Sequence, residues 1–103
     1  MKRHLYENLI NSYVAKIHRS AVMALNNIEV GDLIYRTVNE AFDTLTVLDN
    51  NRPSTNFRAF RKSLLTLFES APDVCISYKN AVSYAILLTK KFSRKQSNMF
   101  GEH

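Results

Sequence analysis

An all-α fold, a single-domain bundle of four helices, is the architecture that this sequence predicts. The chain has only two glycines and two prolines in 103 residues, which is too few for the many turns of a sheet protein. Gly31, Pro53 and Pro72 stand where breaks between helices are needed. Between the breaks, apolar residues recur at spacings of three and four, which is the period of a helix that buries one face.

The first two helices are predicted over residues 3–26 and 32–48. Asn26 and Asn27 can end the first helix, Gly31 reopens the chain, and Asp32 can accept a hydrogen bond from the free backbone N–H groups of the second. The apolar stripe of the first helix comprises Leu5, Leu9, Tyr13, Ile17, Ala21 and Ala24. The stripe of the second comprises Ile34, Val38, Ala41, Phe42, Leu45 and Leu48.

The third helix is predicted over residues 55–70, after a polar linker that ends in two possible capping residues, Ser54 and Thr55. Its core face comprises Phe57, Phe60, Leu64, Leu67 and Phe68. Pro72 ends this segment, and Asp73 is the expected N-cap of a fourth helix over residues 73–94. The broad apolar face of that helix comprises Val74, Tyr78, Ala81, Val82, Ala85, Ile86, Leu88 and Phe92.

One alternative concerns residues 74–78, which are apolar enough for a short strand. No second convincing strand exists to satisfy its backbone hydrogen bonds, so the helix is favoured. Residues 1–94 therefore form one helical domain of ordinary size. Residues 95–103 are expected to be a flexible basic and polar tail.

The composition indicates a cytoplasmic location. Cys75 is the single cysteine, so no intramolecular disulfide can form and a reducing compartment fits best. Polar residues follow the basic N-terminus where a secretory signal would be apolar. The longest uncharged stretch, residues 80–89, is far shorter than the roughly 20 residues that a membrane span requires. No membrane partner is expected.

Charge is divided unevenly along the chain. Residues 1–51 carry five Lys and Arg against six Asp and Glu, whereas residues 52–103 carry nine against three. The basic residues gather at the start of the third helix, where Arg52 precedes three others, and at the end of the fourth. If these two helices are antiparallel, both groups lie at one end of the bundle. The predicted nucleic-acid-binding residues are Arg58, Arg61, Lys62, Lys90, Lys91, Arg94 and Lys95.

Two other interpretations of this basic end stay open. Surface Lys and Arg are common, so the residues can form an ordinary solvated face. Cations near the C-terminus of a helix also stabilise its dipole. No known nucleic-acid-binding module is present, since the chain has no CxxC pair, no GXXG loop, no aromatic RNP-type strand and no basic leucine zipper. A helix-turn-helix around Gly31 would place an acidic helix against phosphates, so that match is weak.

The fourth helix also has apolar residues outside its core face. Ile76 and Leu87 are eleven residues apart and share one stripe, with Tyr84 near its edge. A helix that is apolar almost all round is normally buried on several sides. The alternative is that Ile76, Tyr84 and Leu87 form a homodimer or partner interface.

No enzyme chemistry, cofactor or metal site is expected. The three histidines and the cysteine have no ligand spacing. Glu40 and Asp43 form a carboxylate pair on a polar helix face, with Arg36 placed for surface pairing. Tyr6, Tyr13 and Tyr78 fall on core faces, which favours burial over base stacking; Tyr35 and Tyr84 stay open.

The sequence therefore favours a small, intracellular, non-enzymatic regulatory protein that binds nucleic acid through the basic end of its third and fourth helices. The alternative is a protein-interaction module, such as an adaptor, an inhibitor or an immunity-type protein. Such a module would act through the apolar stripe of the fourth helix or by docking its basic end on an acidic protein. A homodimer is possible in either case.

Overall fold

A computed structural model describes the backbone over residues 2–27, 29–49 and 55–101, and the side chains of residues 5–27, 29–49 and 55–95. Over these residues the chain forms four helices and no strand. The helices are α1 (Lys2–Met23), α2 (Gly31–Leu48), α3 (Thr55–Ser70) and α4 (Ile76–Gly101). Each helix contacts the other three, so the predicted all-α bundle is confirmed.

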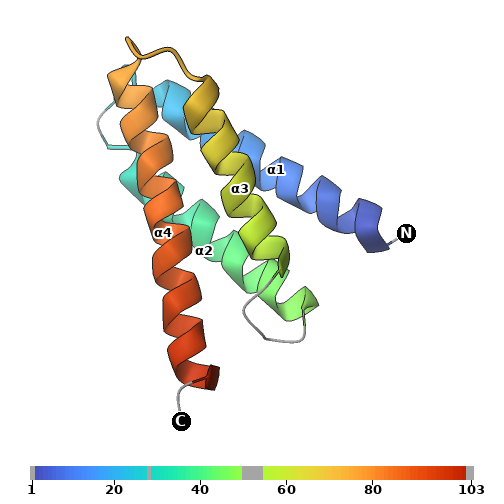
Figure 1. The fold of residues 1–103 in the computed structure, drawn as a ribbon. Helices are drawn as coiled ribbons and strands as arrows, with labels where there is room; N and C mark the ends of the chain where they lie inside the picture. Colours follow the sequence, from blue (N-terminus) through green and yellow to red (C-terminus); the bar gives the residue numbers. More distant parts are fainter. Residues whose placement is uncertain (1, 28, 50–54, 102–103) are drawn as a thin grey trace.

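The helices α3 and α4 run in opposite directions (Figure 1). The start of α3 and the second half of α4 therefore lie toward the same end of the molecule, where α2 also ends. Phe42 of α2 links the three helices there, because its ring lies 5.0 Å from that of Phe57 in α3 and 5.4 Å from that of Phe92 in α4. The antiparallel arrangement on which the single basic end depends is thus present.

Each helix contributes its predicted apolar stripe to one core. Ile17, Ile34, Phe60 and Val82, one from each helix, are fully buried. The other buried apolar residues are Ile10, Tyr13, Ala21, Val30, Val38, Ala41, Leu45, Phe57, Leu64, Tyr78, Ala81, Ala85, Ile86 and Leu88. Leu5 was expected in the core but is 51% exposed. The first turns of α1 extend away from the other helices (Figure 1), which explains that exposure.

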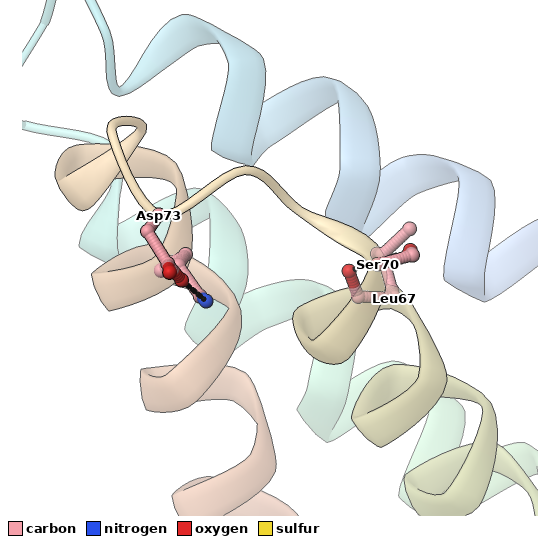
Figure 2. Close-up of polar contacts among 4 residues, drawn as sticks. Leu67, Ser70 and Asp73 are labelled. Atoms are coloured by element: carbon pink, nitrogen blue, oxygen red, sulfur yellow. Dashed lines mark hydrogen bonds and ion pairs between the residues drawn. The ribbon is translucent and has the colours of Figure 1, made fainter.

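The start of α4 differs from the prediction. Residues 72–75 form a turn in which the Cys75 N–H donates to the Pro72 carbonyl at 3.0 Å, and the helix begins only at Ile76. Asp73 is therefore not the N-cap; its carboxylate instead accepts from Lys79 Nζ at 3.0 Å (Figure 2). Val74 precedes the helix and is 87% exposed, so its predicted place in the core is wrong.

The remaining helix ends show smaller differences. Val30 occupies the N-cap of α2 without a side-chain hydrogen bond, so Asp32 is not the cap but lies in the first turn, where a negative charge is favourable. The helix α1 ends at Met23 rather than residue 26, and residues 24–26 form a turn. The helix α4 continues past the predicted residue 94 to Gly101, since no proline or glycine interrupts it earlier.

The bounds predicted for α3 match the structure, but its cap comes from an unexpected residue. The Thr55 N–H donates to the Asp49 carboxylate at 2.8 Å. Thr55 is thus the first helical residue and not the cap. The linker residues 50–54, including Arg52 and the predicted capping residue Ser54, lie outside the described residues.

Candidate nucleic-acid interface

The α3 part of the basic end is built by helical spacing. Phe57, Phe60 and Leu64 point into the core, which leaves Arg58 and Lys62 exposed on the outer face. Arg61 is half-buried at the margin between these two faces. All three cations lie in the first half of α3, at the end of the molecule where α4 finishes (Figure 1).

The α4 part comprises Lys90, Lys91, Arg94 and Lys95, all of which are exposed. The contacts of residues earlier in α4 show which neighbouring helix each side of α4 faces, and helical spacing then assigns each of the four cations to a side. Lys79 Nζ lies 4.7 Å from the centre of the Phe68 ring, so the Lys79 side of α4 faces α3. Lys90 follows Lys79 by eleven residues and returns to the same stripe.

Arg61 lies on the matching side of α3. It precedes Phe68 by seven residues and so shares the side of α3 that faces α4. Arg61 and Lys90 therefore border the contact between the two helices, with three exposed cations beside them on the outer faces. We call this set the seam cluster: Arg58, Arg61, Lys62, Lys90 and Arg94.

Lys91 and Lys95 lie on the other side of α4. The Tyr84 ring lies beside Gly31, the first residue of α2, and Lys91 and Lys95 follow Tyr84 by seven and eleven residues. They consequently share the side of α4 that faces α2. The structure thus places all seven predicted residues at one end, but divides them between two sides of α4.

None of these seven cations has an acidic partner among the described residues. The ion pair found there joins Lys79 to Asp73, and no side-chain hydrogen bond of the seven is present in the same part of the chain. The exposed acidic residues Asp32 and Asp43 project from the outer face of α2. The Asp49 carboxylate lies where α3 begins, but the seven cations outnumber it, so this end of the molecule has an excess of positive charge.

The three residues predicted to form a partner interface lie on two different sides of α4. Ile76 and Leu87 are 66% and 49% exposed on the face of α4 that points away from the other helices. The helix contacts α1, α2 and α3 but leaves this face open. Tyr84 instead borders a hollow of about 320 Å³ beside α2, which it lines with Ala24, Val30 and Gly31.

A second hollow was not predicted from the sequence. It has a volume of about 370 Å³ and lies between the ends of α1 and α3 and the turn before α4, with Val22, Leu25 and Leu67 in its wall. At its edge, His18 Nδ1 and Tyr78 Oη are hydrogen-bonded at 2.8 Å. Burial raises the pKa of the Tyr78 hydroxyl, and the neighbouring Cys75 raises that pKa further.

No three of the described His, Cys, Asp and Glu side chains gather closely enough to hold a metal ion. Over the same part of the chain, none of the helices is both long and apolar enough to cross a membrane. Compared with protein-family models, with curated proteins and with solved structures, the chain matches none of them.

Proposed function

We propose that this protein is a small, non-enzymatic regulator that binds nucleic acid through its basic end. The observation that supports this function is the group of seven cations without an acidic partner, gathered where α3 begins and α4 ends. Lys and Arg side chains bind phosphate oxygens by charge-assisted hydrogen bonds. Binding would release counterions from the nucleic acid, so its affinity would depend strongly on salt.

The expected recognition is of the phosphate backbone rather than of base sequence. The seam cluster lies on helix faces that also carry Leu65 and Ser83. The exposed rings of Tyr35 and Tyr84 lie on the α2 side of α4, and stacking of bases on such rings is tolerant of sequence. Phosphate contacts position a protein on nucleic acid without reading sequence. The protein would therefore bind different sequences with similar affinity, and any regulation would come from occupancy or from a second partner.

Fluorescence anisotropy with labelled random-sequence DNA and RNA tests this function at about 50 and about 200 mM salt, where phosphate contacts weaken steeply. Lys62→Glu changes the seam cluster and Lys91→Glu changes the side of α4 that faces α2, and each should weaken binding at least several-fold. Arg19→Glu, an equal charge change at an exposed site on α1, is the control. Unchanged affinity in both variants would disprove the proposed surface.

The exposure of Ile76 and Leu87 favours a second candidate, a protein-interaction module. Leu87→Asp should then abolish the complex while leaving the helical content intact, because Leu87 lies outside the core. A complex with an acidic protein docked on the basic end should instead persist in Leu87→Asp and be lost in Lys62→Glu. The two variants thus separate the stripe from the basic end as the binding surface.

A further inference from the structure

The outer face of α4 carries a stripe that is complementary to itself. It consists of Ile76, Asn80, Ser83 and Leu87, all exposed and all on one side of the helix. The two large apolar residues stand at its ends, and the small polar residues lie between them. If a second α4 is laid antiparallel on this stripe with Ile76 opposite the partner's Leu87, then Asn80 falls opposite the partner's Ser83.

The same register brings opposite charges together. Lys90 lies three residues beyond Leu87 in α4, and Asp73 lies in the turn just before Ile76. The antiparallel pairing therefore brings the partner's Lys90 to the end of α4 beside which Asp73 lies. The Asp73 side chain is 98% exposed, and Lys90 is exposed without an acidic partner among the described residues. A parallel pairing would instead place Lys90 against the partner's Lys90, which is unfavourable.

We infer that the protein forms a two-fold symmetric dimer in which the α4 helices pack antiparallel through this stripe. Each dimer contains two apolar contacts between Ile76 and Leu87 and two ion pairs between Asp73 and Lys90. Because the contact is self-complementary, the assembly closes at two copies. The stripe is short compared with a standard protein interface, so we expect dissociation in the micromolar range.

The dimer also bears on how the protein would contact a nucleic-acid duplex, and this step rests on the proposed nucleic-acid function. A two-fold axis perpendicular to α4 keeps the α3 sides of both copies on the same face of the dimer. Lys90 and Arg94, the α4 members of the seam cluster, are centred between ten and eleven residues from that axis, so these cations of the two copies lie about 32 Å apart along the helices at a rise of about 1.5 Å per residue. This distance is close to one turn of B-DNA, roughly 34 Å. The Lys90 and Arg94 pairs of the two copies could therefore contact one duplex about a turn apart.

Sedimentation velocity without nucleic acid, from about 5 to about 200 μM protein, tests the dimer across the micromolar dissociation range expected for a small interface. The wild type should shift from monomer to dimer with concentration. Leu87→Asp should weaken the dimer at least tenfold, because it places a charge against the partner's Ile76. Val47→Asp is the matched control, since Val47 is 62% exposed on the outer face of α2. A wild type that stays monomeric throughout would overturn the inference.

A charge swap tests the register independently. Asp73→Lys and Lys90→Asp should each weaken the dimer several-fold, and the double variant should restore it. Asp73→Lys also removes the ion pair with Lys79, but that pair is exposed and contributes little to folding. A double variant no better than the single ones would contradict the antiparallel register.

Duplexes of about 8 and about 16 base pairs separate the two proposals, since only the longer spans a full turn of roughly 10 base pairs. The wild type should bind the longer duplex at least tenfold more tightly. Leu87→Asn, which removes the apolar contact without adding a negative charge beside Lys90 and Lys91, should lose this advantage while still binding the shorter. A dimer that binds neither duplex would contradict the nucleic-acid function alone. Binding without any dimer would contradict the dimer alone.

Discussion

At the scale of single residues, the buried hydroxyl groups differ in whether they are satisfied. The Thr89 hydroxyl donates to the Ile86 carbonyl at 2.6 Å, and the Tyr13 hydroxyl donates to Thr44 Oγ1 at 3.1 Å. The buried Thr46 hydroxyl has no hydrogen-bond partner among the described residues. A buried polar group without a partner loses its hydration and gains nothing in return, which is unfavourable for folding.

Replacing Thr46 with valine should therefore stabilise the protein by about 1 kcal/mol, because the unsatisfied oxygen becomes a methyl group of similar size. Urea denaturation monitored by circular dichroism measures the change in the free energy of unfolding. Thr89→Val is the matched control, and it should be neutral or destabilising because its hydroxyl already has an acceptor. A lower unfolding free energy for Thr46→Val would contradict this reasoning.

The pKa of Tyr78 predicts how stability changes in alkali. Burial, with a further effect of Cys75, raises this pKa above the ordinary value of 10.0. The folded state therefore holds the phenolic proton more tightly than the unfolded state. The stabilisation is fully present below pH 10.0 and is lost as the pH rises through the folded pKa.

Tyr78→Phe should remove this part of the alkaline loss of stability. The urea midpoint of the wild type should fall more steeply than that of the variant as the pH rises above 10.0. The variant should also be less stable near neutral pH, because it lacks the hydrogen bond to His18. Parallel midpoint curves for the two proteins would show that Tyr78 does not titrate differently on folding.

At the scale of helices, the sequence predicts the interior of each element better than its ends. The stripes of apolar residues depend only on helical period, and they identified Ile17, Val38, Phe60 and Val82 as core. The start of a helix depends on which of several nearby polar residues reaches the free N–H groups. Asp73 has the right chemistry for a cap, but the turn after Pro72 directs its carboxylate to Lys79.

Asp49 was not predicted to be a cap, yet its side chain caps α3 from six residues away across the linker. Asp49→Ala should cost about 1 kcal/mol of unfolding free energy, the usual contribution of a capping side chain. Asp73→Ala is the comparison, and it should change stability by less than about 0.5 kcal/mol because its ion pair is exposed. Equal effects of the two variants, measured by urea denaturation, would contradict the assignment of Asp49 as the cap.

At the scale of the whole molecule, the sequence could predict that the seven cations lie at one end, but not that they are divided between two sides of α4. Sequence spacing identified the outward position of Ile76 and Leu87, because the period of one helix determines its own faces. The separation of Lys90 from Lys91 depends on which neighbour covers each side of α4, and that choice is made by tertiary packing. The hollow beside His18 and Tyr78 went unpredicted for the same reason, since three helices and the turn before α4 build it.

The excess positive charge of the basic end should also reduce the stability of the fold. Like charges that crowd at one end repel one another, and salt screens this repulsion. The melting temperature should therefore rise as sodium chloride increases from about 20 to about 300 mM, over which range the Debye length falls from about 20 to about 6 Å. Chloride is suitable because sulfate would stabilise the protein by a separate effect.

Lys62→Glu should raise the melting temperature at low salt and make its salt dependence less steep, while it weakens nucleic-acid binding. Arg19→Glu changes the net charge equally on α1 and should have a smaller effect on both quantities. A surface cation that destabilises the fold yet strengthens binding is expected at a phosphate-binding site, whereas an ordinary solvated face with the same charges would show the effect on stability without the effect on binding. A wild type whose melting temperature is unchanged by salt would show that the seven cations are too far apart to repel.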